Sequence, residues 1–162
     1  MMETVTTDVR VLAICAAVLY VKFLATTMIQ GRKGFHAGTH TPEDSKLFCT
    51  DPSMPKQEGY CNAETVPAHL KIAYESEQRW KRIVQNDLES MPLAFIVFVA
   101  TIAVGGNKMV TSVLMVAYTV ARITHTIVYA KMLQPHRMIA WMSGIFCVLA
   151  VAVNGVLAAL TK

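Results

Sequence analysis

The chain carries four blocks in which most residues are apolar and few are charged. They are Val9–Ile29, Met91–Val104, Met109–Leu133 and Met138–Leu160. A bilayer core about 30 Å thick requires about 20 apolar residues per helix. Three blocks reach that length, and the second reaches it by recruiting polar residues before Met91. The pattern therefore predicts an all-α integral membrane protein, a bundle of four transmembrane helices over about residues 9–30, 70–104, 108–133 and 136–160.

The segment between the first two helices, about residues 31–69, has a different composition. It is rich in Gly, Pro, Thr, Asp and Ser and lacks helical periodicity, so we expect a connection outside the membrane. Helical periodicity resumes near Pro67, but Ala68–Ser90 is too polar for lipid, so the second helix should project from the membrane. Pro92 is expected to kink that helix. We expect a single domain over residues 1–162, without a separate soluble domain.

Composition supports the membrane assignment and predicts an orientation. The chain is 54% hydrophobic, with a mean hydropathy of +0.41 and a net charge of +4. These values argue against a water-soluble globule, and we expect no nucleic-acid partner. Basic residues gather in the long connection and beside the turn between the third and fourth helices, at Lys131 and Arg137. Because basic residues mark the cytosolic side, we expect the connection to face the cytosol and both termini to face the opposite side.

The four cysteines do not suggest a disulfide framework. Cys49 and Cys61 lie in the connection assigned to the cytosol, where thiols stay reduced. With His36 and His40 they form the candidate set for a zinc site. Their spacing matches no zinc pattern and contains no CxxC, so we expect no metal.

Polar residues on the predicted helices form two stripes. The stripe on the second helix, spaced i, i+4, i+7, consists of Arg82, Asn86 and Glu89. The stripe on the third helix, with similar spacing, consists of Arg122, His125 (or Thr126) and Tyr129. Such spacing places side chains on one face of a helix. Arg137 falls within the first turn of the fourth helix and adds another cation.

Two interpretations of these stripes are open. Glu89 and Arg122 can form a buried ion pair that only fixes the register of the helices. Alternatively, the arginines outnumber their acidic partners, because Glu89 neutralises one and Asp87 points to a different face. Surplus guanidinium in an apolar setting indicates an anionic ligand, since arginine binds carboxylates through a planar fork of donors. Lys22, near the middle of the first helix, is expected to face other helices or reach the interface, with an internal polar site as the alternative.

Three segments resemble the membrane-associated proteins in eicosanoid and glutathione metabolism, the MAPEG family. They are Lys81–Pro92, Ala121–Tyr129 and Gln134–Arg137, with weaker similarity at Gly31–Phe35 and Pro42–Asp44. The nearest branch is similar to the microsomal glutathione transferases and microsomal prostaglandin E synthase. Glutathione carries two carboxylates, one ammonium and a thiol, which suits arginines accompanied by one acidic residue.

The resemblance implies a homotrimer with glutathione, the co-substrate, bound at subunit interfaces near the cytosolic side. It implies a location in the endoplasmic reticulum, or in the mitochondrial outer membrane. The glutathione-binding residues would be Arg82, Asn86, Glu89, Arg122, His125 and Tyr129. The catalytic residues would be Arg137, which stabilises the thiolate, and Tyr129. A nearby guanidinium lowers the pKa of a thiol and makes it a better nucleophile. The lipophilic electrophile would enter from the membrane lipid along an apolar groove.

Several positions depart from the family pattern. Gln85 stands where relatives often carry arginine or leucine. Ile29 stands where an arginine is expected near the end of the first helix, with Arg32 or Lys33 as candidate substitutes. Met138 replaces a serine of the prostaglandin synthase, which argues against that activity. We therefore favour a glutathione transferase acting on lipophilic electrophiles, with glutathione peroxidase activity as an extension. The alternatives are a non-catalytic lipid-binding scaffold, a glutathione-dependent eicosanoid synthase, and a four-helix channel or transporter.

Overall fold

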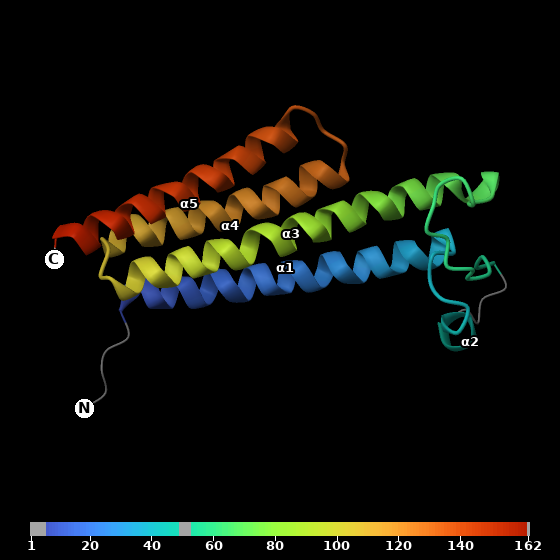
Figure 1. The fold of residues 1–162 in the computed structure, drawn as a ribbon, viewed down its shortest axis with the longest axis horizontal. Coiled ribbons are helices and arrows are strands. Elements are labelled where there is room, and N and C mark those ends of the chain that lie inside the picture. Colours follow the sequence, from blue (N-terminus) through green and yellow to red (C-terminus); the bar gives the residue numbers. More distant parts are fainter. Residues whose placement is uncertain (1–5, 49–52, 162) are drawn as a thin grey trace. The chain divides into compact units, whose positions relative to one another are not determined.

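The computed structural model describes residues 6–48 and 53–161, which contain helices and no strand. In chain order the elements are α1 (Thr7–Ala37), α2 (Asp44–Phe48), the 3-10 helix η1 (Ala68–Leu70), α3 (Lys71–Ala103), α4 (Lys108–Ala130) and α5 (His136–Thr161) (Figure 1). Four helical segments, α1, α3 with η1, α4 and α5, are each long and apolar enough to cross a membrane. The four predicted helices are therefore confirmed.

Helix ends differ from the prediction in two places. α1 continues to Ala37, well into the segment expected to lack helix. The polar stretch Gln30–Lys33 limits how far the helix can lie in lipid, but Gln, Arg and Lys are good helix formers and do not end a helix in water. α4 ends at Ala130 rather than near residue 133, and Met132 after it has a φ of 59°, which no helix can continue. α3 runs on through Pro92, and the kink expected there stays a prediction.

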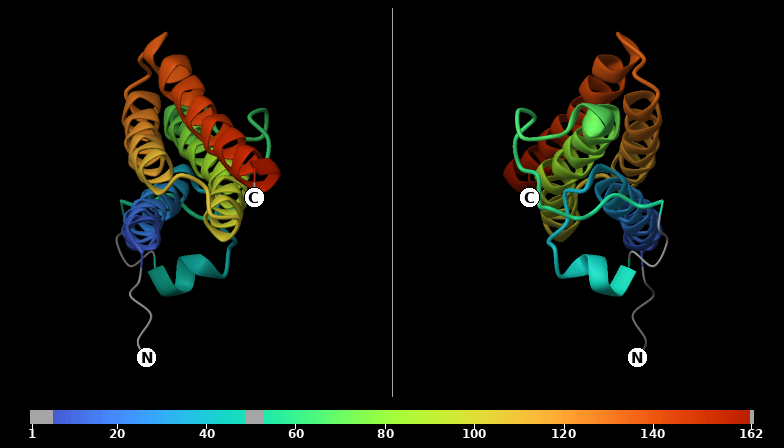
Figure 2. Two further views of the ribbon diagram at one scale, coloured as in Figure 1. Left: turned by 90° about the vertical axis from the view of Figure 1, so that its left-hand side faces the viewer. Right: turned by 90° about the vertical axis from the view of Figure 1, so that its right-hand side faces the viewer.

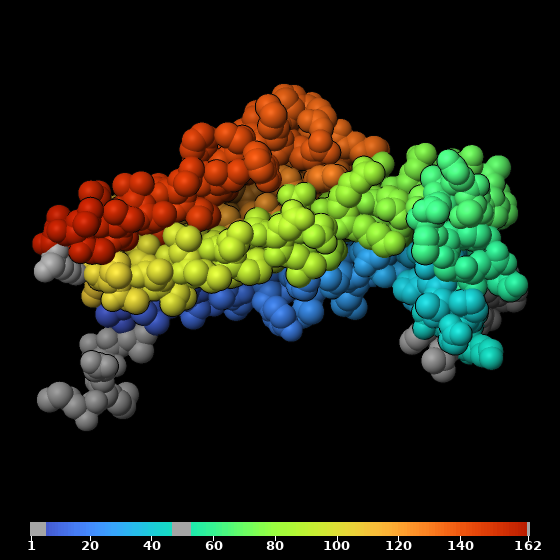
Figure 3. All heavy atoms as spheres, viewed as in Figure 1, coloured from blue at the N-terminus to red at the C-terminus, as the bar shows by residue number. Residues whose placement is uncertain are grey.

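The long helices present apolar side chains on their outer surface. Met28, Leu93, Val113, Phe146 and Leu160 are all at least 60% exposed. On the face shown in Figure 3, α5 lies at the surface along its length. Exposing such side chains to water costs about 25 cal/mol per Å², a cost that lipid or a neighbouring subunit removes. The surface is therefore that of helices that lie in a membrane.

The described chain divides into two compact units. The first contains residues 6–23 and 87–161, and in it α4 packs along α5 (Figure 2). All four long helices contribute to its core, which consists of Cys15, Leu19, Met91, Ala94, Phe98, Met115, Tyr118 and Val151. The rings of Phe98 and Tyr118 meet edge to face with centroids 5.4 Å apart, so α3 and α4 are joined at the centre of this core.

A polar network joins the turn between α3 and α4 to α5. Asn107 caps α4, because its side-chain oxygen accepts from the backbone N–H groups of Met109 at 3.1 Å and Val110 at 3.2 Å. The Asn154 side chain of α5 accepts from the Asn107 N–H at 3.2 Å and donates to the Thr111 hydroxyl at 2.9 Å. These bonds satisfy polar groups at the end of the first unit.

The second unit, residues 24–86, contains the end of α1, the connection and the start of α3. Its small apolar core consists of Ala37, Val66 and Tyr74. The Gln57 side chain is fully buried, donates to the carbonyls of Phe35 and Pro55 at 2.9 and 2.8 Å, and accepts from the His40 N–H at 3.3 Å. Within the predicted connection the structure therefore adds the end of α1 and the short helix α2, which the lack of helical periodicity did not indicate.

Candidate functional site

One face of α4 passes from apolar to polar as the helix proceeds. Met115, Tyr118, Arg122 and His125 follow one another at intervals of three or four residues, and each is at most 2% exposed. These intervals keep the side chains on one face. Arg122 and His125 therefore lie inside the first unit, as the stripe on this helix predicts.

The Arg122 and Lys22 side chains both bind the carboxylate of Asp87. Arg122 Nη2 donates to Asp87 Oδ1 at 2.6 Å, and Lys22 Nζ donates to Oδ2. The side chains of Asp87, Arg122 and Lys22 are 0%, 2% and 10% exposed. A charge held away from water is costly unless it is paired, so the shared carboxylate stabilises both cations. These three residues, the buried triad, link α1, α3 and α4.

The triad residues lie on the core-facing sides of their helices. Lys22 follows the core residue Leu19 by three positions, and Asp87 precedes the core residue Met91 by four. This spacing is a signal in the sequence that the interpretation of the stripes did not use. A charge in register with a buried apolar face requires a buried partner of opposite sign.

The predicted charge balance is wrong for Arg122. That prediction counted Arg122 among arginines with Glu89 as the only available carboxylate. Asp87 instead supplies a fully buried carboxylate to Arg122, while Glu89 is exposed. Asp87 does point to a different face of α3 from Asn86, and that face is the one directed at α4. Lys22 faces other helices, as expected.

A second cluster lies where α4 ends and α5 begins. The guanidinium carbon of Arg137 lies 4.5 Å from the centroid of the Tyr129 ring, a cation–π contact. The Tyr129 ring meets the His125 ring edge to face, with centroids 5.6 Å apart. When its amide oxygen faces Arg137, Gln134 accepts from Nη2 at 2.6 Å. The structure therefore brings together His125, Tyr129 and Arg137, which we call the Arg137 cluster.

The Arg137 cluster has unused capacity for a ligand. Arg137 is half-buried and forms no ion pair with any residue in 6–48 or 53–161. His125 Nδ1 is buried and has no hydrogen-bond partner in the same part of the chain. Buried polar atoms are nearly always hydrogen-bonded, so an orphaned one marks a place where a ligand or water can bind. The cluster can therefore stabilise an anion and form a hydrogen bond to it.

The three candidate residues of the second helix share α3 but differ in burial. Arg82 and Glu89 are exposed, and Asn86 is half-buried with its amide 3.5 Å from the Arg82 carbonyl oxygen, to which it donates. Arg82 lines a hollow of about 400 Å³ with Lys81 and Gln85, and forms no ion pair within the described chain. Arg82 and Asn86 belong to the second unit and Glu89 to the first, so their convergence on one ligand stays a prediction.

The possible metal ligands of the described residues are their His, Cys, Asp and Glu side chains. Within them, no group of three or more His, Cys, Asp or Glu side chains is placed to hold a metal ion. Cys15, Cys61 and Cys147 are free thiols, and Cys49 lies outside the described residues.

Comparison with known sequences gives one family. Residues 11–157 match the sequence model of the MAPEG family, which includes glutathione transferases and eicosanoid synthases. No curated protein gives a match. The match covers α3 and α4 completely, α1 and α5 except at their outer ends, and both polar clusters.

Proposed function

The chain belongs to the MAPEG family, and on that premise we propose that it is a membrane-bound glutathione transferase acting on lipophilic electrophiles. Members of the family use glutathione. Arg137 carries the proposal, because it is a half-buried cation on the Tyr129 ring with no acidic partner in the described chain. A cation in this setting is suited to an anionic ligand, because arginine binds carboxylates and thiolates through its planar donors.

The proposed chemistry at Arg137 is activation of a thiol. A free thiol is only a few per cent ionised at pH 7, and the thiolate is the nucleophile. A guanidinium beside the sulfur stabilises the anion and lowers the pKa of the thiol. The thiolate then attacks the electrophilic carbon, a carbon–sulfur bond forms, and the leaving group departs with its bonding electrons. Tyr129 orients the guanidinium through its ring and offers its hydroxyl as a donor to the sulfur.

The rest of glutathione would be held by polar side chains of two helices. On α3 the proposed contacts are Arg82 and Asn86, with Glu89 for the ammonium. On α4 they are His125 and Arg122. Arg122 already donates to Asp87, but a guanidinium carries five N–H donors, so this bond leaves it able to bind a carboxylate as well.

The proposed oligomeric state and cellular location of the protein also rest on its membership of the family. We propose a homotrimer with glutathione at the subunit interfaces, in the endoplasmic reticulum membrane, with the lipophilic electrophile arriving through lipid. The same thiolate would support peroxidase activity, in which two glutathione molecules reduce a lipid hydroperoxide to the alcohol and water and leave as the disulfide.

The decisive experiment compares glutathione binding with turnover in Arg137→Ala. Purified wild-type protein in detergent should bind glutathione in a calorimetric titration and conjugate 1-chloro-2,4-dinitrobenzene. The variant should keep most of its glutathione affinity and lose turnover about a hundredfold, a typical effect of removing one group that stabilises a developing anion. Lys131→Ala removes an exposed cation from the same turn and should leave both measurements unchanged.

Two outcomes would contradict the proposal. Full turnover in Arg137→Ala would reject the thiolate role of this residue. A folded wild-type protein without measurable glutathione affinity would reject the transferase itself and favour the non-catalytic lipid-binding alternative.

A further inference from the structure

The buried triad contains one cation more than an ion pair requires. Arg122 Nη2 donates to Asp87 at 2.6 Å, and this pair alone would be neutral. Lys22 adds a second positive charge at the other carboxylate oxygen, and its side chain is only 10% exposed. A charge inside a membrane segment is expensive, and such residues usually mark a function. Lys22 therefore needs a reason beyond the pairing of Asp87 with Arg122.

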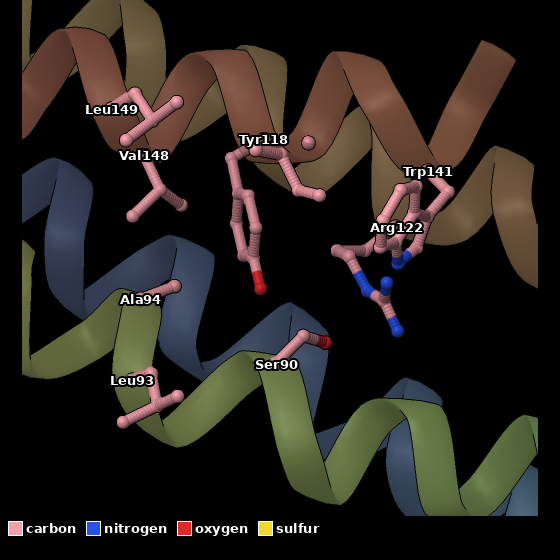
Figure 4. A pocket seen from close by; sticks show the side chains of 10 residues that line it. Ser90, Leu93, Ala94, Tyr118, Arg122, Trp141, Val148 and Leu149 are labelled. Atoms are coloured by element: carbon pink, nitrogen blue, oxygen red, sulfur yellow. The ribbon is translucent and has the colours of Figure 1, made fainter. Parts of the chain in front are cut away.

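The surroundings of Arg122 do not balance this extra charge with a second buried carboxylate. Figure 4 shows the Arg122 side chain extending from α4 toward α3, beside a cavity of about 200 Å³. Among the described residues that line this cavity, none is acidic. Glu89, the next acidic residue of α3, is exposed, and the buried carboxylate of Asp8 lies at the start of α1. The triad by itself therefore places two positive charges and one negative charge in an apolar interior.

The triad and the Arg137 cluster lie in the same unit and act on the same side chain. His125, a member of the cluster, follows Arg122 by three residues, so the two side chains share one face of α4. The charges of all three triad residues act on the His125 ring, as does the charge of Arg137. The triad and the cluster therefore share one electrostatic environment.

The buried position of Lys22 gives its charge a long reach. Tyr129, which contacts Arg137, lies seven residues after Arg122, about 10 Å along α4. At an effective dielectric constant of about 20, a unit charge about 10–15 Å away changes a pKa by about one unit. Water and salt screen an exposed charge far more strongly. Lys22 can therefore stabilise an anion beside Arg137 without touching it.

We propose that Lys22 sets the net positive charge of the site at which the thiol of glutathione is activated. By neutralising Asp87, it keeps the charge of Arg122 effective toward an anionic ligand, so the bound thiol loses its proton to water more readily. The inference rests on the proposed transferase function and adds a residue to it. Lys22 touches no reacting atom, so it is a positioning residue that acts through Asp87 and Arg122.

The test removes the charge of Lys22 and keeps the rest of the triad. Lys22→Met leaves the neutral pair of Asp87 and Arg122, so the protein should fold, and Lys22→Gln provides a second uncharged variant. Lys22→Arg retains the charge. Lys131→Met is the matched control, because it makes the same substitution at an exposed cation in the turn that precedes Arg137.

The measurement is the ultraviolet absorbance of bound glutathione thiolate, followed against pH at saturating glutathione. Lys22→Met and Lys22→Gln should raise the pKa of the bound thiol by about 0.5–1 unit. Below the wild-type pKa, turnover of 1-chloro-2,4-dinitrobenzene should therefore fall about 3- to 10-fold, and well above it turnover should match the wild type. Lys22→Arg and Lys131→Met should follow the wild-type curve. The difference should persist at high salt, because a buried charge is poorly screened.

The results separate this inference from the transferase proposal. If the wild type activates glutathione but the uncharged variants keep its thiol pKa, the role of Lys22 is wrong and the transferase stands. Loss of turnover at every pH, in Lys22→Arg as much as in Lys22→Met, would show that Lys22 only holds the helices together. An equal pKa shift in Lys131→Met would also overturn the inference, because any nearby cation would then suffice. A folded wild-type protein that forms no bound thiolate would reject both proposals.

Discussion

Asp87 shows how one side chain can set the charge balance of a membrane interior. It is fully buried and accepts from both Lys22 and Arg122, so the triad has one formal negative charge for two positive charges. Charged groups inside a membrane segment are expensive and usually pair with one another. Arg122 therefore already binds a protein carboxylate, whereas Arg137 is half-buried on an aromatic ring with no acidic partner in the described chain. In the proposed function, Arg137 therefore has the larger part in binding the anion.

The triad predicts that two substitutions, each replacing a charged side chain by an uncharged one, destabilise the protein by different amounts. Asp87→Asn removes the carboxylate of the triad and leaves its two cations buried together, which should cost about 3–5 kcal/mol of stability. Lys22→Met leaves the neutral pair of Asp87 and Arg122 intact and should cost about 1 kcal/mol or less. Thermal unfolding in one detergent measures both. Equal destabilisation by the two substitutions would show that the carboxylate is not shared as described.

At the scale of the element, α5 carries two glycines with opposite tolerance for a side chain. A Cβ at Gly155 would lie 2.6 Å from Thr101 Oγ1 and 3.3 Å from Thr101 Cα, so α3 approaches α5 closely there. The Thr101 hydroxyl also donates to the Val151 carbonyl at 3.1 Å, which holds it in place. At Gly144 the nearest atoms are 3.7 Å away or more. Gly155 is thus required for the packing of the two helices, whereas Gly144 is not.

This contrast gives a prediction with an internal control. Gly155→Ala should destabilise the protein by about 1–3 kcal/mol, because the helices must separate to admit the methyl group. Gly144→Ala should be neutral or slightly stabilising, since alanine favours helix over glycine by up to about 1 kcal/mol. Thr101→Ala should reduce the cost of Gly155→Ala when the two are combined, which a double-mutant cycle of unfolding temperatures would reveal. Purely additive effects would argue against direct contact.

At the scale of the whole molecule, the sequence predicts the helices better than their contacts. Hydropathy locates the four spans because lipid requires long apolar segments. Hydropathy does not show how each helix is rotated about its own axis. It therefore does not show that Asp87 faces Arg122 and Lys22. Periodicity also does not predict the fold of the second unit. There the Gln57 side chain donates to the Phe35 carbonyl, 22 positions earlier in the chain, and such a contact leaves no periodic pattern.

The orientation in the membrane gives the last prediction. The connection between α1 and α3 is rich in basic residues, so it should face the cytosol, and the turn at Lys108 should face the lumen. Cys61 is exposed in that connection. In a Cys49→Ser background, a membrane-impermeant maleimide should label Cys61 in sealed endoplasmic reticulum microsomes without detergent. With both Cys49 and Cys61 replaced by serine, Lys108→Cys should react only after the membrane is permeabilised. The reverse pattern would place the connection in the lumen, and labelling of both from outside would contradict a crossing by α3.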